Sequence, residues 1–357
     1  MYILLTNLHL LVSLTFMKIA VVGCGGNGGL IAGILASKKL DIVCIELIEE
    51  SVRIIREQGI RLQGKKGSVH ARVKAATSFT DEQGKFDIII IAVKSNVLES
   101  VFLEARNHIC NEGFIVTLQN GLEILSISEK YPSIKIVAGA VGYNSIMLEY
   151  GKYLVTSEGG ITIGNLTCAA SEDLFLLKGI FEPEIKIDVS NNIKGVLWAK
   201  LLIVCGVTGL GGVAGLLLGD LLKYRVSRKL FYKIVTEGVL AAHKLGIRIV
   251  KFSGGINPER FGDHKCGYPL FLRWLLLKIA GLKNKNVKSN IQRDLEKGKK
   301  TEVDYINGKV VEIGETVGID APVNRKVVEI VKEIEEKKRD MSPKNLYEIW
   351  ETVCKPD

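Results

Sequence analysis

The sequence has few of the residues that build disulfide frameworks and metal centres. Its seven cysteines are odd in number and widely spaced, and no two of them form a C-x-x-C pair. The five histidines show no H-x-x-x-H spacing. These absences exclude a disulfide-stabilised secreted scaffold and predict that the protein has no structural metal. Because free thiols are typical of a reducing compartment, we expect a cytoplasmic protein.

A strong charge of one sign is also missing. The net charge of +9 is small for 357 residues, and the most basic stretch, residues 283–300, has acids interleaved among its lysines. This pattern is typical of a solvated surface rather than a nucleic-acid-binding patch, so we expect no nucleic-acid partner. A mildly basic surface does suit an anionic cofactor or a small acid substrate.

Long uncharged runs occur at two places. Residues 1–16 lack the basic start and the cleavage site of a secretory signal, and Met17 stands directly before an apolar strand. We therefore expect residues 1–16 to be a non-native leader, with a membrane anchor as the alternative. Leu201–Gly219 is long enough to span a membrane, but its many glycines favour a buried helical core. We expect the glycine cluster at 209–212 to end one helix and start another, and we expect no membrane partner.

The N-terminal half begins with a strand, a glycine-rich turn and a helix. Lys18–Val22 is a short apolar run typical of a buried parallel strand. The turn matches G-x-G-x-x-G, in which the glycines permit a tight turn, close approach of a pyrophosphate and close helix packing. The phosphates would lie against the free N–H groups at the start of the helix. The sequence therefore predicts a dinucleotide site whose cofactor contacts come from Gly23, Cys24, Gly25, Gly26, Asn27 and Gly28.

The acid that ends the second strand bears on the choice of cofactor. Glu46 follows Ile42–Ile45, where a carboxylate accepts hydrogen bonds from a ribose 2′-OH and repels a 2′-phosphate. Leu47 comes next, so no adjacent arginine holds a phosphate, although Arg53 and Arg56 lie on the following helix. NADPH and NADH both stay open, and Glu46 and Leu47 favour NADH. The other interpretation of Glu46 is a surface acid at a strand end.

Two further apolar strands end in polar residues, the first at Lys94 and the second at Asn120. In open α/β sheets ligands bind outside the carboxyl ends of the strands. We therefore expect both side chains to contact the cofactor, and Asn120 also to contact the substrate. The alternative for Asn120 is a tight turn with Gly121. Residues 136–164 contain two more apolar runs, which we expect to close the sheet.

From Ile193 onward the apolar residues recur at helical spacing. We predict an α/β protein with an N-terminal Rossmann domain over 17–188, an all-helical domain over 189–340 and a C-terminal tail over 341–357. The site would lie in the cleft between the domains. The insert at 253–286 has four interpretations: a lid, a dimer contact, a membrane-surface helix or a core helix. A homodimer therefore stays open.

Five short motifs together resemble one known family. They are "GCGGNG" at 23–28, "AVK" at 92–94, "LQNGL" at 118–122, "LWAKL" at 197–201 and "TEVDYINGKV" at 301–310. Over Lys18–Glu335 the chain is similar to the ketopantoate reductases. The resemblance implies a two-domain architecture and hydride transfer from NADPH or NADH to a 2-oxo acid, in pantothenate biosynthesis. It also implies that the proton-donating lysine of the family falls on Lys200 and its site glutamate on Glu302. The strand-end lysine and the asparagine of the family fall on Lys94 and Asn120.

The chemistry gives Lys200 a role that does not depend on the resemblance. Hydride addition to a ketone forms an alkoxide, which needs a neighbouring positive charge and a proton. A lysine at the mouth of an apolar helix supplies both, because burial lowers the pKa of an amine toward neutrality. Taken alone, Lys200 also fits a surface lysine packed beside Trp198.

The chain departs from the family pattern at the substrate. Asparagines that hold the substrate in the family fall on Val204, Thr208 and Leu218, and a substrate serine falls on Asn290. We therefore expect substrate contacts from Asn120, Thr208 and Asn290, and a substrate that is 2-dehydropantoate or a more apolar analogue. Each lost hydrogen bond to a polar substrate costs about 1 kcal/mol.

Two other functions are compatible with the sequence. One is a dinucleotide-binding sensor or scaffold whose catalytic site has decayed, which the apolar residues at the substrate positions suggest. The other is an opine-type or 3-hydroxyacid dehydrogenase, for which His243 is the candidate catalytic histidine.

Overall fold

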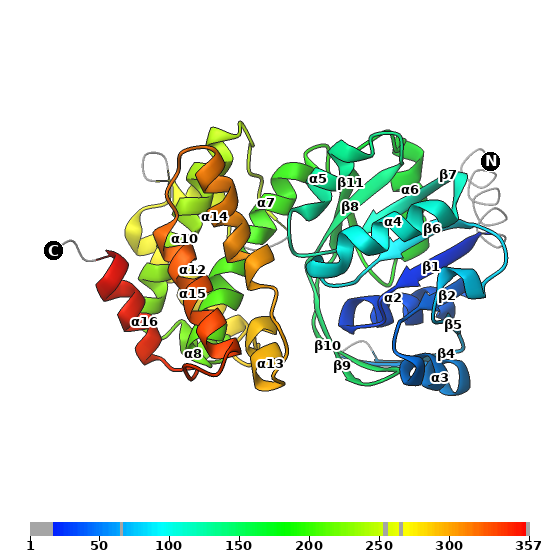
Figure 1. Cartoon of the computed structure of the whole chain (residues 1–357), viewed down its shortest axis with the longest axis horizontal. Coiled ribbons are helices and arrows are strands. Elements are labelled where there is room, and N and C mark those ends of the chain that lie inside the picture. The colour runs from blue at the N-terminus through cyan, green and yellow to red at the C-terminus, as the bar shows by residue number, and fades with distance from the viewer. Residues whose placement is uncertain (1–16, 65–66, 253–255, 264–266, 355–357) are drawn as a thin grey trace. The chain divides into compact units, whose positions relative to one another are not determined.

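The computed structural model describes residues 17–64, 67–252, 256–263 and 267–354 (Figure 1). The chain divides into two compact units. One holds the chain up to Gln119 together with Glu123–Ile193, and the other holds Asn120–Leu122 together with the chain from Lys194 onward. The first unit is built on a mainly parallel sheet and the second is helical, so the predicted fold class is confirmed. The expected leader, residues 1–16, lies outside the described residues.

The main sheet of the first unit is buried on both faces. Its strand order over the described residues is β12-β11-β8-β7-β6-β1-β2-β5, and only β11 and β8 pair antiparallel. In β6 the four isoleucines at 88–91 are at most 1% exposed, as expected of a parallel strand covered by helices on both sides. The strands are β1 (Lys18–Val22), β2 (Asp41–Ile45), β5 (Lys74–Ala76), β6 (Phe86–Ile91), β7 (Ile109–Thr117), β8 (Ile136–Val141), β11 (Ile161–Asn165) and β12 (Ile187–Val189). The helical elements of the unit are α2 (Gly26–Ser37), α3 (Glu49–Gln58), η1 (Phe79–Asp81), η2 (Ser95–Val97), α4 (Leu98–His108), α5 (Glu123–Lys130) and α6 (Ser171–Phe181).

A second, smaller sheet packs against helix α2. Its order is β4-β3-β10-β9, from β3 (Ile60–Gly64), β4 (Gly67–Ala71), β9 (Asn144–Glu149) and β10 (Lys152–Ser157). Glycine lets α2 pack closely against this sheet. A Cβ on Gly29 of the helix would lie only 1.9 Å from the ring of Tyr153 on β10. Residues 136–164 thus hold the two expected strands of the main sheet, β8 and β11, and between them β9 and β10, which the sequence interpretation did not include. The reason is tertiary, since β10 pairs with β3 from a distant part of the chain.

The described residues of the second unit form helices joined by loops, with no strands. Helix α10 (Arg225–Lys244) is followed by Gly246 at φ +70°, the left-handed conformation expected after a helix end. The elements are α7 (Ile193–Val204), the π-helical turn η3 (Cys205–Gly209), α8 (Leu210–Ala214), α9 (Leu218–Leu221), α10, α11 (Pro258–Gly262), α12 (Leu270–Lys283), α13 (Asn290–Glu296), η4 (Val303–Tyr305), α14 (Asn307–Thr316), α15 (Pro322–Glu335), α16 (Lys344–Ile349) and the π-helical η5 (Trp350–Cys354).

The long apolar run forms one continuous helix from Ile193 to Ala214. It is long and apolar enough to cross a membrane, but 83% of its most apolar window is buried inside the protein, as in a core helix. The predicted break at residues 209–212 was wrong, because the helix continues through the π-helical turn and ends at Gly215, whose φ is +67°. Close packing compensates for the poor helix propensity of glycine here. A Cβ on Gly206 would lie 2.5 Å from the ring of Phe231, and one on Gly212 would lie 2.2 Å from Ile291.

Two segments of the second unit bear on the sequence interpretation. The expected tail contains α16, whose Leu346 and Ile349 are fully buried in the core. Within the insert at 253–286, parts of which lie outside the described residues, α12 packs through Arg273 and Leu277. The other side of α12 is exposed and apolar, which is not expected of a core helix. Its exposed side chains are Leu270, Phe271, Leu275, Ile279 and Leu282.

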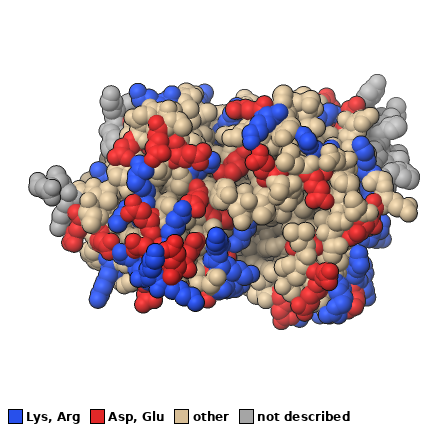
Figure 2. All heavy atoms as spheres, viewed as in Figure 1, with Lys and Arg blue, Asp and Glu red and all other residues tan. Residues whose placement is uncertain are grey.

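The surface carries both signs of charge. On the face drawn in Figure 2, acidic and basic side chains are interspersed over the helical unit. Within the basic stretch at 283–300, Lys288 forms an ion pair with Glu296 at 2.9 Å. The positive charge of this stretch is therefore partly compensated inside the stretch itself.

Candidate active site

The glycine loop between β1 and α2 has the geometry of an anion-binding turn. Gly23 has a φ of +86°, which favours glycine, and a Cβ on Gly28 would lie 1.9 Å from the Gly23 carbonyl oxygen. A Cβ on Gly25 would instead meet open space, so the backbone here is accessible to a ligand. Gly25 caps α2 without a side-chain hydrogen bond, which leaves the N–H groups of the first turn available. These features fit a dinucleotide pyrophosphate.

The second sheet supports this loop from behind. The Tyr153 hydroxyl donates to the Cys24 carbonyl at 2.7 Å, and both residues are buried. The Ser145 hydroxyl donates to Asn27 Oδ1 at 3.3 Å. The sequence interpretation missed both supporting residues. Only the pairing of β10 with β3 and with β9 reveals them, because nothing in their local sequence links them to the glycine loop.

Glu46 lies against the loop and not out in solvent. One of its carboxylate oxygens accepts the Cys24 N–H at 2.8 Å. Leu47 is 83% exposed. The two arginines of α3 have other partners: Arg53 pairs with Glu57 at 3.1 Å, and Arg56 Nε donates to the Ala75 carbonyl. The end of β2 therefore presents a carboxylate and no adjacent guanidinium.

The two strand-end loops after β6 and β7 are joined by Gln119. This buried side chain donates to the carbonyls of Ile91 and Val93, at 3.0 and 3.3 Å, directly before Lys94. Lys94 is exposed and caps the short helix η2. Asn120 is half-buried and belongs to the helical unit, although it follows a strand of the sheet unit.

Lys200 and Glu302 form the main electrostatic feature of the helical unit. Lys200 lies on α7 and is 6% exposed, while Glu302 precedes η4 and is 9% exposed. Burial lowers the pKa of Lys200 from 10.5 to about 8, and the Glu302 carboxylate opposes that decrease. The result is an ammonium group that can release its proton near neutral pH.

The helix surface that follows Lys200 is mostly apolar. Ile203, Val204 and Val207 are half-buried side chains on the next turns. Thr208 is buried, and its hydroxyl donates to the Val204 carbonyl at 2.9 Å, so its proton is already engaged within the helix. Leu218 is buried in α9.

Asn290, the remaining predicted substrate contact, is exposed at the start of α13 and accepts a long 3.5 Å hydrogen bond from Arg293. Its neighbour Ser289 is buried, and the Ser289 hydroxyl caps the helix by accepting the Gln292 N–H. The proposed contact of Asn290 with substrate stays a prediction.

A buried polar network holds the π-helical turn next to the lysine helix. Glu237 accepts the backbone N–H groups of Val323 and Asn324, both at 3.0 Å, and the Asn324 side chain at 2.7 Å. Asn307 donates to Asn324 and to the Cys205 carbonyl of the turn. Burial raises the pKa of Glu237 to about 7. Asn307 lies in the "DYING" stretch at 304–308, and Asn324 lies in the "APVN" stretch at 321–324. The sequence alone did not show that these two asparagines have a structural role.

The other candidate residues have ordinary structural roles. His243 bonds Glu259 at 3.3 Å on a partly exposed face of α10. The described residues contain no group of three histidines, cysteines or acids able to hold a metal ion.

Comparison with known proteins decides the family. The family described as ketopantoate reductase PanE/ApbA matches residues 19–167, and its C-terminal domain matches residues 192–335. The chain belongs to the ketopantoate reductase family. It is thus a nicotinamide-dependent oxidoreductase that acts on CH–OH groups. The retained Lys200 and Glu302 also disfavour the decayed-sensor alternative.

Relatives match over nearly the whole chain. A 2-dehydropantoate 2-reductase of Pyrococcus abyssi is 28% identical over 321 residues, which cover 86% of this chain and 94% of the relative. That of Archaeoglobus fulgidus is 23% identical and covers 89% and 98%. Among solved structures, a PanE/ApbA family ketopantoate reductase from Ralstonia eutropha superposes with a TM-score of 0.76 at 23% identity, covering 91% of this chain and all of that one. D-mandelate dehydrogenase with NADH and anilino(oxo)acetate has a TM-score of 0.77 at 20% identity and covers 90% and 99%.

Proposed function

We propose that this reductase converts a 2-oxo acid to the 2-hydroxy acid with NADH, and that its substrate is more apolar than 2-dehydropantoate. The observation that carries the proposal is the buried Lys200, whose pKa is about 8 beside Glu302, on a helix that continues with apolar side chains.

Lys200 would stabilise the product oxygen and protonate it. Bound NADH would supply a hydride to the carbonyl carbon of the substrate. The ammonium group stabilises the negative charge that develops on the carbonyl oxygen and then donates its proton to that oxygen. With a pKa of about 8, Lys200 is about nine-tenths protonated at pH 7 and still acidic enough to transfer the proton. The Glu302 carboxylate favours the charged form of Lys200, because it raises the pKa of the lysine.

Support for NADH over NADPH comes from the end of β2. The Glu46 carboxylate is held at the loop by the Cys24 N–H, where it would accept hydrogen bonds from the ribose hydroxyls. Glu49 and Glu50 add negative charge in the first turn of α3. A 2′-phosphate would meet these carboxylates while Arg53 and Arg56 are engaged elsewhere.

Support for an apolar substrate comes from the turns after Lys200. Ile203, Val204 and Val207 are the half-buried side chains there, and the hydroxyl proton of Thr208 is bonded to the helix backbone. A polar substrate would leave hydroxyl groups unpaired against these side chains, which costs about 1 kcal/mol or more for each group. A branched aliphatic or aromatic substituent on the 2-oxo acid would gain from their burial.

Steady-state kinetics tests the proposal. Oxidation of NADH and of NADPH would be followed at 340 nm with 2-dehydropantoate, 3-methyl-2-oxobutanoate and phenylglyoxylate. We expect the highest kcat/KM with NADH and one of the two apolar acids, and a 10²- to 10⁴-fold loss of kcat in Lys200→Ala. No turnover with any of the three acids would overturn the proposed function. A higher kcat/KM for 2-dehydropantoate would overturn the apolar substrate class.

A further inference from the structure

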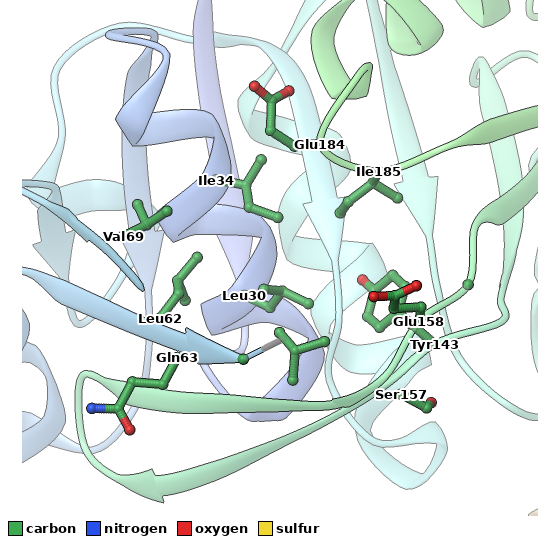
Figure 3. Close-up of a pocket in the computed structure, with 13 residues that line it drawn as sticks. Leu30, Ile34, Leu62, Gln63, Val69, Tyr143, Ser157, Glu158, Glu184 and Ile185 are labelled. Carbon is green, nitrogen blue, oxygen red and sulfur yellow. The ribbon is translucent and has the colours of Figure 1, made fainter. Parts of the chain in front are cut away.

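We propose that the first unit contains an accessory binding site for a small neutral molecule, in an apolar cavity between helix α2 and the second sheet. The cavity has a volume of about 200 Å³. Its apolar lining comes from Leu30 and Ile34 of α2, Leu62 and Val155 of the sheet, and Ile185 near the start of β12 (Figure 3).

The cavity contains one polar group that lacks a partner. The Tyr143 hydroxyl is buried, and no hydrogen bond satisfies it among the described residues. In Figure 3 the hydroxyl points toward the space between Leu30 and Ile185. Burial raises the pKa of Tyr143, so the group stays protonated and able to donate. Buried polar atoms are nearly always paired in folded proteins, so an unpaired hydroxyl on a cavity wall marks a place for a ligand atom.

The polar side chains around the cavity restrict the charge of the ligand. The Glu184 carboxylate points away from the cavity and pairs with Lys38 at 2.8 Å (Figure 3). Glu158 lies at the mouth and is exposed. Its negative charge and the apolar lining both disfavour a carboxylate. The site therefore selects against 2-oxo acids and nucleotides, which separates it from the proposed active site.

The volume restricts the size of the ligand. An apolar protein cavity of about 150 Å³ holds benzene, so 200 Å³ accommodates a molecule of about eight non-hydrogen atoms. The class that fits is a neutral alcohol, phenol or amide with one compact apolar body. Its single oxygen would pair with the Tyr143 hydroxyl.

The test uses 4-methylphenol as the probe and the full-length protein. Saturation-transfer NMR and calorimetry should show binding to the native protein. Tyr143→Phe keeps the ring and removes the hydroxyl, so it should weaken 4-methylphenol binding about five- to tenfold and leave toluene binding unchanged. Benzoate, which carries a carboxylate, should bind more weakly than 4-methylphenol.

Two cavity-filling variants provide the control. Ile185→Phe and Val69→Phe each add a ring to the lining, and whichever stays folded should reduce 4-methylphenol binding more than tenfold. Saturating NADH together with a 2-oxo acid should not displace the probe. Unchanged binding in the filled variants, equal affinity in Tyr143→Phe, or displacement by NADH would overturn the proposal. None of these results would bear on the proposed reductase activity, which is measured separately.

Discussion

Turnover in the reductive direction should fall as the pH rises through about 8. The reaction consumes a proton that Lys200 donates, and burial lowers the pKa of this lysine to about 8. Above that value each further pH unit removes about nine-tenths of the remaining ammonium form. We therefore expect kcat/KM to be roughly a hundredfold lower at pH 10 than at pH 7. A lysine with the ordinary pKa of 10.5 would keep most of its activity to pH 9.

Glu302→Gln tests the electrostatic part of this reasoning, because it keeps the size of the side chain and removes its charge. The Glu302 carboxylate raises the pKa of Lys200, so the decline in activity should begin at a lower pH in the variant. In Lys200→Arg the guanidinium stays protonated over the whole range, and residual activity should show no decline near pH 8. The reasoning would be refuted if Glu302→Gln left the pH profile unchanged, or if Lys200→Arg kept the decline.

The same group affects stability with a defined sign. Between pH 8 and 10.5 the unfolded chain binds more protons at Lys200 than the folded chain, so the free energy of unfolding rises with pH across this window. At pH 7 the buried ammonium costs roughly 3 kcal/mol, at about 1.4 kcal/mol per pKa unit. The double variant Lys200→Met, Glu302→Gln should abolish turnover and raise the free energy of unfolding at pH 7 by up to about 3 kcal/mol, measured by urea denaturation, because it removes the buried ammonium without leaving the Glu302 carboxylate uncompensated. A marked loss of stability would contradict this account.

Three more perturbations follow from the structure. The double variant Glu46→Gln, Leu47→Arg should move the NADPH-to-NADH ratio of kcat/KM upward by about tenfold or more, and an unchanged ratio would remove Glu46 from cofactor selection. Glu237→Gln should lower the free energy of unfolding by about 1–3 kcal/mol, because its amide leaves one buried N–H of the α15 start without an acceptor. Since burial raises the pKa of Glu237 to about 7, native stability should fall as the pH rises from 4.5 to 7, and denaturation of Glu237→Gln should lack this dependence. Val204→Asn should raise kcat/KM for 2-dehydropantoate relative to 3-methyl-2-oxobutanoate by about fivefold, and a ratio that moves the other way would count against the substrate assignment.

Local sequence determined the dinucleotide-binding end of the molecule. The strand, the glycine spacing and the acid at the end of β2 obey steric rules that act over a few residues, so they could be predicted without knowing the rest of the fold. The helical character of the second half also follows from local periodicity. The apolar surface after Lys200 could also be predicted from the sequence. Its side chains lie on a single helix, so their spacing along the chain is enough to place them on successive turns.

Tertiary structure decided what the sequence could not. Lys200 and Glu302 are far apart in the chain, and the pKa of about 8 exists only because the folded core removes water from the amine. Phe231 and Ile291 pack against the helix at Gly206 and Gly212, where a Cβ would otherwise lie, and this long-range packing offsets the poor helix propensity of glycine. The pairing of β10 with β3 brings Tyr153 to the glycine loop and helps enclose the cavity beside Tyr143. Long-range pairing and burial depend on the whole chain, and no local pattern encodes either of them.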